Sequence, residues 1–215
     1  MQGTHHMTQA HRMCLNRAAR ELHDHYRGVF GEETIRSLLF SSYAELAATA
    51  TVRNWLAIGA ERFARQRLQA LAHARIAATG RKPSVLFLCV HNAGRSQIAL
   101  GWFTQLAGGR AIAWSGGSQA AAQVNPDVVT TMAEAGIDIS AEFPKPWTDE
   151  FLLAADIVIT MGCGDACPLL PGKRYEDWEI DDPDGKTLDQ IRIIRDQIRA
   201  KVTGLLQSIE PATSR

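Results

Sequence analysis

The chain has 215 residues, of which 46% are apolar and 21% are charged, so it is long enough to bury a core without disulfide bridges. Lysine and arginine together number 23, as do aspartate and glutamate, and this balance excludes an overall field that would recruit nucleic acid or an acidic membrane surface. No segment approaches the roughly 20 apolar residues of a membrane span, and the polar start lacks the apolar core of a signal peptide, so we expect a cytoplasmic protein.

The first 80 residues show a purely helical pattern. Their apolar residues recur at spacings of three and four, which indicates three amphipathic helices and no strand. Breaks at residues 28–31 and 49–51 separate the helices, and a Gly- and Pro-containing segment at 79–84 ends the set. We therefore expect two domains, a three-helix bundle over residues 1–80 and a second domain over residues 81–215.

The pattern changes after Pro83, where apolar segments suited to strands alternate with amphipathic helices. The expected elements, starting with a strand and alternating with helices, are 84–90, 96–107, 111–117, 125–136, 156–161 and 187–209. Alternation of this kind implies a parallel sheet covered on both faces, with ligands bound at the carboxyl ends of its strands. Cys89 lies at such an end, and residues 162–167 follow another.

Residues 89–96, CVHNAGRS, lead from the first of these strands into the next helix. A loop that closes on a helix N-terminus turns its N–H groups inward, and the helix dipole favours an anion there. Arg95 adds a planar guanidinium for a tetrahedral oxyanion, and the same positive field should stabilise the thiolate of Cys89 as a nucleophile. In the plainer alternative Cys89 is a buried strand residue, but the spacing to Gly94 and Arg95 favours the anion site.

This loop resembles that of the low-molecular-weight tyrosine phosphatase family, whose signature is a cysteine, five residues and then Arg-Ser. The resemblance covers about residues 84–208 and implies an α/β fold with a flavodoxin-like four-stranded parallel sheet, with Cys89 as the nucleophile. Asn92 would hold the loop in shape, and Ser96 would stabilise the thiolate. The residues expected to bind the oxyanion are Val90, His91, Asn92, Ala93, Gly94, Arg95 and Ser96.

A second segment, DWEIDDPDG, carries a candidate general acid. The phosphatase family uses an aspartate directly before a proline to protonate the leaving oxygen, and the resemblance assigns this role to Asp182, which precedes Pro183. Without the Cys89 loop, the segment would be interpreted as a plain turn, because Asp, Pro and Gly are strong turn formers.

Two further cysteines, Cys163 and Cys167, follow the strand expected at 156–161. A zinc site is disfavoured, because no second pair of Cys or His ligands is nearby, and we expect no metal anywhere in the chain. A closely spaced dithiol in a glycine-containing loop suits thiol-disulfide exchange instead. With the segments 124–140 and 178–183, this arrangement resembles the arsenate reductases built on the phosphatase fold, specifically the thioredoxin-linked kind with three redox cysteines.

That resemblance implies a thiol relay with no bound cofactor. Cys89 attacks arsenate, for which phosphate and sulfate are mimics, and Asp182 assists the departure of hydroxide. Cys163 then attacks the sulfur of Cys89 and releases arsenite, Cys167 attacks Cys163, and thioredoxin reduces the Cys163–Cys167 bond. The gap between Cys163 and Cys167 is shorter than in the best-known thioredoxin-linked members. The alternatives are therefore a mycothiol- or glutathione-dependent arsenate reductase, a low-molecular-weight tyrosine phosphatase, residual phosphatase activity in a reductase, and a non-catalytic oxyanion sensor.

The helical part is an addition to this fold. Some actinobacterial members look similar in carrying a three-helix extension. Through Gly80 the chain has ten arginines and six acidic residues, an excess too small to favour DNA binding, so we rank a homodimer or packing on the catalytic domain first. Cys14, in the first helix, is expected to be a small buried hydrophobe.

Overall fold

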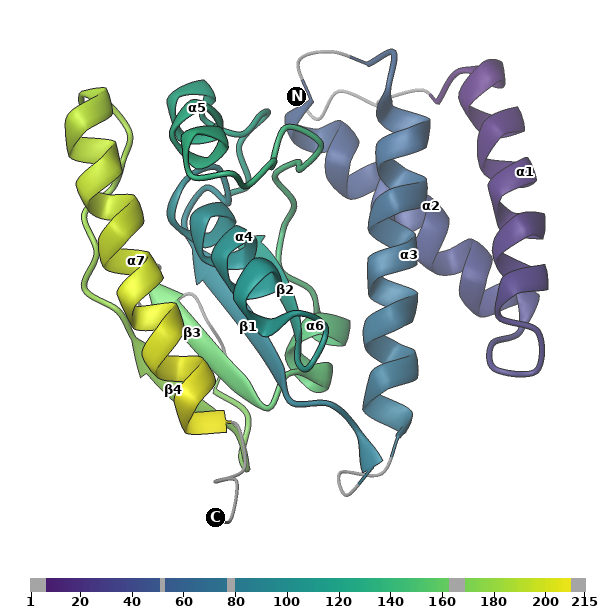
Figure 1. The fold of residues 1–215 in the computed structure, drawn as a ribbon. Coiled ribbons are helices and arrows are strands. Elements are labelled where there is room, and N and C mark those ends of the chain that lie inside the picture. The colour runs from purple at the N-terminus through teal and green to yellow at the C-terminus, as the bar shows by residue number, and fades with distance from the viewer. Residues whose placement is uncertain (1–6, 51–52, 77–79, 163–168, 210–215) are drawn as a thin grey trace. The chain divides into compact units, whose positions relative to one another are not determined.

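The computed structural model describes residues 7–50, 53–76, 80–162 and 169–209 (Figure 1). The chain divides into two compact units, Met1–Ile76 and Ala77–Arg215, each with its own core. Within the described residues, no helix combines the length and the apolar composition needed to cross a membrane.

The first unit consists of three helices, α1 (Gln9–His25), α2 (Glu32–Thr49) and α3 (Leu56–Arg75). Thr8 starts α1 by accepting a bond from the N–H of His11, as expected of an N-cap threonine. The apolar stripes expected from the sequence face one another and form the core of this unit.

The expectation that Cys14 is buried was wrong, because this thiol is exposed. The buried stripe of α1 consists of Leu15, Ala18, Ala19 and Leu22. Cys14 stands about 100° around the helix axis from Leu15, on the opposite side from Ala19, so it falls outside the stripe.

The second unit is built on a four-stranded sheet. Its strands are β1 (Ser84–Cys89), β2 (Ile112–Gly117), β3 (Ile157–Met161) and β4 (Arg174–Asp177). They lie in the order β2-β1-β3-β4 and every neighbouring pair is parallel, which confirms the expected flavodoxin-like arrangement. All six residues of β1 are buried, because this strand lies inside the sheet and is covered on both faces. Its last residue, Cys89, pairs with Gly117 on one side and Met161 on the other.

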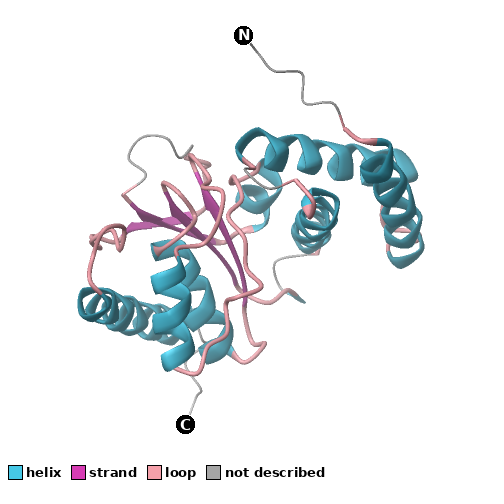
Figure 2. Ribbon diagram, turned by 90° about the horizontal axis from the view of Figure 1, so that it is seen from above, coloured by secondary structure: helices cyan, strands magenta, loops and turns pink. Residues whose placement is uncertain are grey.

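Four helices accompany the sheet: α4 (Arg95–Ala107), α5 (Pro126–Glu134), α6 (Asp149–Ala154) and α7 (Leu188–Ile209). The first, second and last of these pack on one face, where they bury Val85, Phe87 and Cys89 of β1 (Figure 2). Short helix α6 lies on the other face. There Phe151 stacks on Trp114, which shares the side of its β1 neighbour Leu86.

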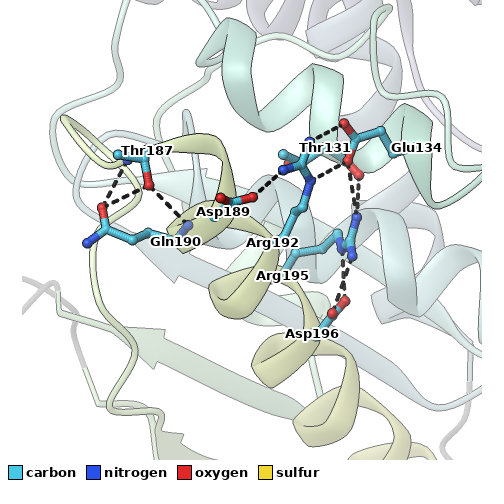
Figure 3. A network of polar contacts seen from close by, with 8 residues as sticks. All are labelled: Thr131, Glu134, Thr187, Asp189, Gln190, Arg192, Arg195 and Asp196. Carbon is cyan, nitrogen blue, oxygen red and sulfur yellow. Dashed lines mark hydrogen bonds and ion pairs between the residues drawn. The ribbon is translucent and has the colours of Figure 1, made fainter.

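A polar clamp ties α5 to α7 (Figure 3). The guanidinium of Arg192 donates two bonds to the carboxylate of Glu134, at 2.8 and 2.7 Å, and Arg195 donates to the carbonyl of Thr131 at 2.8 Å. Hydrogen bonding to Arg192 holds the pKa of Glu134 below its usual range. Because α5 begins at the carboxyl edge of the sheet, the clamp fixes one wall of the site described next.

Candidate active site

Cys89 lies at the carboxyl end of β1, and its sulfur is buried beneath the loop that leads into α4. The backbone N–H of Asn92 donates to this sulfur at 3.2 Å, and the hydroxyl of Ser96 lies 3.0 Å from it. Two hydrogen-bond donors on one sulfur stabilise the thiolate form, which is the nucleophilic form of cysteine.

Asn92 is the hub of the loop. It is fully buried, and within the described part of the chain it is the one residue other than glycine with a positive φ, at 48°. Its side chain donates to the Ser96 hydroxyl at 2.8 Å and accepts from the backbone N–H of Lys145 at 3.0 Å. Asparagine tolerates this left-handed conformation better than most residues, so the identity of residue 92 suits the turn that the loop makes.

The carbonyl groups of the loop face away from the site. Those of Cys89, Val90, His91 and Ala93 accept bonds from N–H groups in residues 118–125, at 2.8 to 3.2 Å. This close packing requires glycine at the end of β2, because a Cβ on Gly117 would lie 2.6 Å from the carbonyl oxygen of Val90. The first N–H groups of α4, which have no acceptor within the helix, stand at the end of the same loop. The loop therefore presents donors rather than acceptors to an anion.

Arg95 and Asp182 form an ion pair across the site. Nη2 of Arg95 donates to a carboxylate oxygen of Asp182 at 2.6 Å, and Nη1 lies 3.4 Å from the carbonyl oxygen of Ile180. The arginine side chain is 9% exposed and the aspartate side chain 43%. Next to them, Pro183 packs so closely on Gly94 that a Cβ there would lie 2.4 Å from its ring. Segments 87 residues apart in sequence thus meet over Cys89.

A cavity of about 490 Å³ opens above the sulfur. Cys89, Arg95 and Asp182 line it together with Asn125 at the start of α5 and the cationic side chain of Lys186. No Phe, Tyr or Trp belongs to the lining among the described residues. Its size and polarity suit a small inorganic oxyanion better than an aromatic ring, which is bound by apolar and aromatic surfaces.

The structure brings together most of the residues that the sequence singled out. The members of the expected oxyanion set that line the cavity are His91, Ala93, Gly94 and Arg95. Asn92 and Ser96 contact the sulfur of Cys89 instead. Cys163 and Cys167 lie outside the described residues. Elsewhere in the described ranges, no group of three or more His, Cys, Asp or Glu side chains could hold a metal ion.

Two residues near the site were missed from sequence. Gln97, the third residue of α4, is fully buried and bonds to Asn92, and Asn125 lines the cavity. The signal for Gln97 was a polar residue in a helix segment otherwise suited to burial. Asn125 precedes a proline, which marks a helix start and says nothing of a cavity.

Comparison with known proteins agrees with this geometry. A family model described as low molecular weight phosphotyrosine protein phosphatase matches residues 84–214, and a model for a protein-tyrosine-phosphatase-like N-terminal domain matches residues 15–72. The solved structure of the thioredoxin-dependent arsenate reductase Cg_ArsC1' of Corynebacterium glutamicum is 46% identical, with a TM-score of 0.84, and the match covers 93% of this chain and 98% of that one.

Two curated relatives match the second unit. A putative arsenate reductase of Halobacterium salinarum is 36% identical over 130 residues, which are 58% of this chain and 92% of the relative. A glutaredoxin arsenate reductase of Synechocystis is 34% identical over 128 residues, 58% of this chain and 97% of the relative. From the matched family model, the sheet order and these relatives, the chain belongs to the low molecular weight phosphotyrosine protein phosphatase family.

Proposed function

We propose that the protein is an arsenate reductase in which Cys89 is the nucleophile and Cys163 and Cys167 complete a thiol relay. One observation carries the proposal. The sulfur of Cys89, with donors from Asn92 and Ser96, lies at the base of a small polar cavity that also holds the Arg95–Asp182 pair. The names of the similar proteins, all arsenate reductases, support the same activity.

The first step is attack on arsenic. The guanidinium of Arg95 and the loop N–H groups bind the arsenate oxygens and neutralise charge as it develops. The thiolate of Cys89 forms a sulfur–arsenic bond, and one arsenate oxygen departs after it receives a proton from Asp182, which leaves as hydroxide or water without a separate acid. This step changes no oxidation state, because oxygen is exchanged for sulfur on arsenic(V).

The second step transfers two electrons. The thiolate of Cys163 attacks the sulfur of Cys89, the sulfur–arsenic bond breaks, and its electron pair stays on arsenic, which leaves as arsenite. The Cys89–Cys163 disulfide holds the oxidising equivalents. Cys167 then attacks Cys163 and frees the Cys89 thiolate, and an external dithiol reduces the Cys163–Cys167 disulfide. We assign that role to thioredoxin, which is named for the Corynebacterium protein; glutaredoxin is named for the Synechocystis protein.

An aryl phosphatase is the weaker candidate, because no aromatic side chain of the described lining is available to hold a phosphotyrosine ring. Slow hydrolysis of small aryl phosphates is expected as a side activity, since the anion site accepts phosphate as an arsenate mimic. Because such a relay needs reduced thiols, we place the enzyme in the cytoplasm, where thioredoxin and glutathione keep cysteines reduced.

A coupled assay tests the proposal. Thioredoxin, thioredoxin reductase and NADPH should give arsenate-dependent NADPH oxidation over many turnovers with the unmodified protein. The Cys89→Ser, Cys163→Ser and Cys167→Ser variants should each lose multiple turnover. The matched control is Cys14→Ser, since Cys14 is an exposed thiol in the helical unit and should leave the rate unchanged.

The outcomes separate the alternatives. Activity that needs mycothiol or glutathione and survives Cys163→Ser would replace the relay with direct attack by a small thiol. Arsenate binding without turnover under every donor would indicate an oxyanion sensor. Aryl phosphate hydrolysis with no arsenate reduction would indicate a phosphatase.

For the helical part, we propose a separate domain over residues 1–80 that mediates a homodimer. Several large apolar side chains of this unit are exposed and would supply contact area: Met13, Val29, Trp55, Ile58 and Ile76. Analytical ultracentrifugation of the full chain, compared with a Trp55→Ser, Ile58→Ser variant, should show a dimer that weakens in the variant; a monomer at all concentrations contradicts this assignment.

A further inference from the structure

Gln97 is buried directly beneath the Cys89 loop and lies outside the lining of the cavity. Its side-chain nitrogen Nε2 lies 3.0 Å from the carbonyl oxygen of Asn92, 3.2 Å from Oδ1 of Asn92 and 3.3 Å from the carbonyl oxygen of Phe143. All three neighbours are oxygens that only accept in this setting, so the amide must place its NH2 group, rather than its oxygen, against them.

The remaining oxygen of this amide, Oε1, is buried with no hydrogen-bond partner among the described residues. A buried acceptor without a donor lowers stability, and an apolar side chain of similar length would avoid that loss. A glutamine at this position is therefore better explained by what its NH2 group holds than by space filling.

The hydrogen-bond directions run from Gln97 to the sulfur. The backbone N–H of Lys145 can only donate, so the side-chain atom of Asn92 that it contacts at 3.0 Å is the oxygen Oδ1. The amide nitrogen Nδ2 of Asn92 must then face Ser96, to whose hydroxyl oxygen it donates at 2.8 Å. With its oxygen accepting from Asn92, the Ser96 hydroxyl has its own hydrogen free for Cys89, 3.0 Å away.

We propose that Gln97 is a positioning residue for the Cys89 thiolate. Together with the Phe143–Lys145 segment, it fixes the left-handed backbone and the amide orientation of Asn92, so that the Ser96 hydroxyl and the Asn92 N–H both donate to the sulfur. The inference rests on the proposed role of Cys89 as nucleophile. It assigns to Gln97 no contact with arsenate.

The test compares Gln97→Met, which keeps length and volume but removes the donor, with Gln105→Met, the same change at an exposed position of the same helix. The readout is the alkylation rate of Cys89 by iodoacetamide against pH, followed by mass spectrometry of the peptide that contains Cys89. In Gln97→Met the midpoint of this profile should move upward by about one pH unit, because the thiolate loses hydrogen-bond donors. Gln105→Met should match the unmodified protein.

Kinetics and a second variant sharpen the test. We expect kcat for arsenate to fall about tenfold in Gln97→Met with KM within about twofold, because Arg95 and the loop N–H groups still bind the anion. In a Ser96→Ala background, Gln97→Met should have a much smaller effect on the alkylation profile, since both changes act on one chain of bonds. Should Gln97→Met fail to fold, Gln97→Glu gives the same comparison with an isosteric side chain that cannot donate.

A lowered melting temperature with an unchanged alkylation profile and unchanged kcat would overturn the inference and leave Gln97 as a packing residue. Additive effects of Gln97→Met and Ser96→Ala would do the same. The alkylation measurement needs no arsenate turnover. A protein that alkylates as predicted and reduces no arsenate would therefore contradict the proposed function and not the role of Gln97.

Discussion

The ion pair between Arg95 and Asp182 makes the arginine unavailable to an incoming anion. Both groups line the cavity, and the 2.6 Å contact uses one of the donors that an oxyanion needs. Arsenate or phosphate must therefore displace the carboxylate of Asp182 from Nη2 of Arg95 before it can bind in full. We predict that Asp182→Asn tightens oxyanion binding even though it removes the expected general acid.

The size of the effect follows from the exposure of the pair. A hydrogen bond to a charged group contributes about 1.5–3 kcal/mol, but the Asp182 side chain is 43% exposed, so solvent screening brings the net contribution to about 1 kcal/mol. Removing that competitor should lower the dissociation constant about fivefold. Loss of the acid should reduce kcat by a factor of about 100 to 10,000. Binding and turnover should thus change in opposite directions.

Isothermal titration calorimetry with phosphate, an unreactive mimic, measures the binding arm at pH 7, and the coupled arsenate assay measures the second. Asp184→Asn is the matched control, because it removes the same charge from the same cavity while leaving the Arg95–Asp182 pair in place. Phosphate binding to Asp182→Asn that is unchanged or weaker would refute the competition. An equal gain in Asp184→Asn would assign the effect to the general field of the cavity.

Three further changes probe packing and electrostatics. Gly94→Ala places a Cβ 2.4 Å from the Pro183 ring, so it should lower stability by about 1–3 kcal/mol and displace the acid loop, which thermal unfolding and the arsenate assay would both register. Leu22→Ala removes a fully buried side chain from the helical unit and should cost about 2–5 kcal/mol of unfolding free energy in urea; an effect below 1 kcal/mol would contradict the packing described. Glu134 has a pKa lowered by Arg192, so its contribution to stability is full above about pH 4.5 and is lost as the pH falls through the lowered value; Glu134→Gln should flatten this acid dependence in denaturant titrations at pH 3 to 7, and an unchanged slope would exclude the carboxylate as its source.

The fold was largely predictable because its helices and inner strands have clear periods. The sequence missed β4, Arg174–Asp177, since its residues Arg-Tyr-Glu-Asp are polar and partly exposed at the edge of the sheet. Pairing with β3, rather than side-chain pattern, makes this segment a strand. Helix α6 was also missed, because six residues are too short to show a helical period.

Prediction of the site depended on how local each contact is. The contacts of Cys89 with Asn92 and Ser96 lie within seven residues and follow from the loop signature. The meeting of Arg95 with Asp182 was anticipated through the resemblance, although periodicity alone does not bring the two together. The contact of the Lys145 backbone with Asn92 spans 53 residues and uses a main-chain N–H, a group that every residue except proline carries, so no residue type could signal it.

The outward-facing carbonyls of the Cys89 loop bear on how quickly the site can act. Their bonds to the N–H groups of residues 118–125 form in the absence of any anion, so the loop has lost its conformational freedom during folding. An arriving oxyanion then meets donors already in position and needs only to exchange its hydration shell and displace Asp182. Hydrogen exchange would show this division, with slow amides over residues 118–125 in the empty protein and, at the start of α4, amides that become slow when phosphate binds.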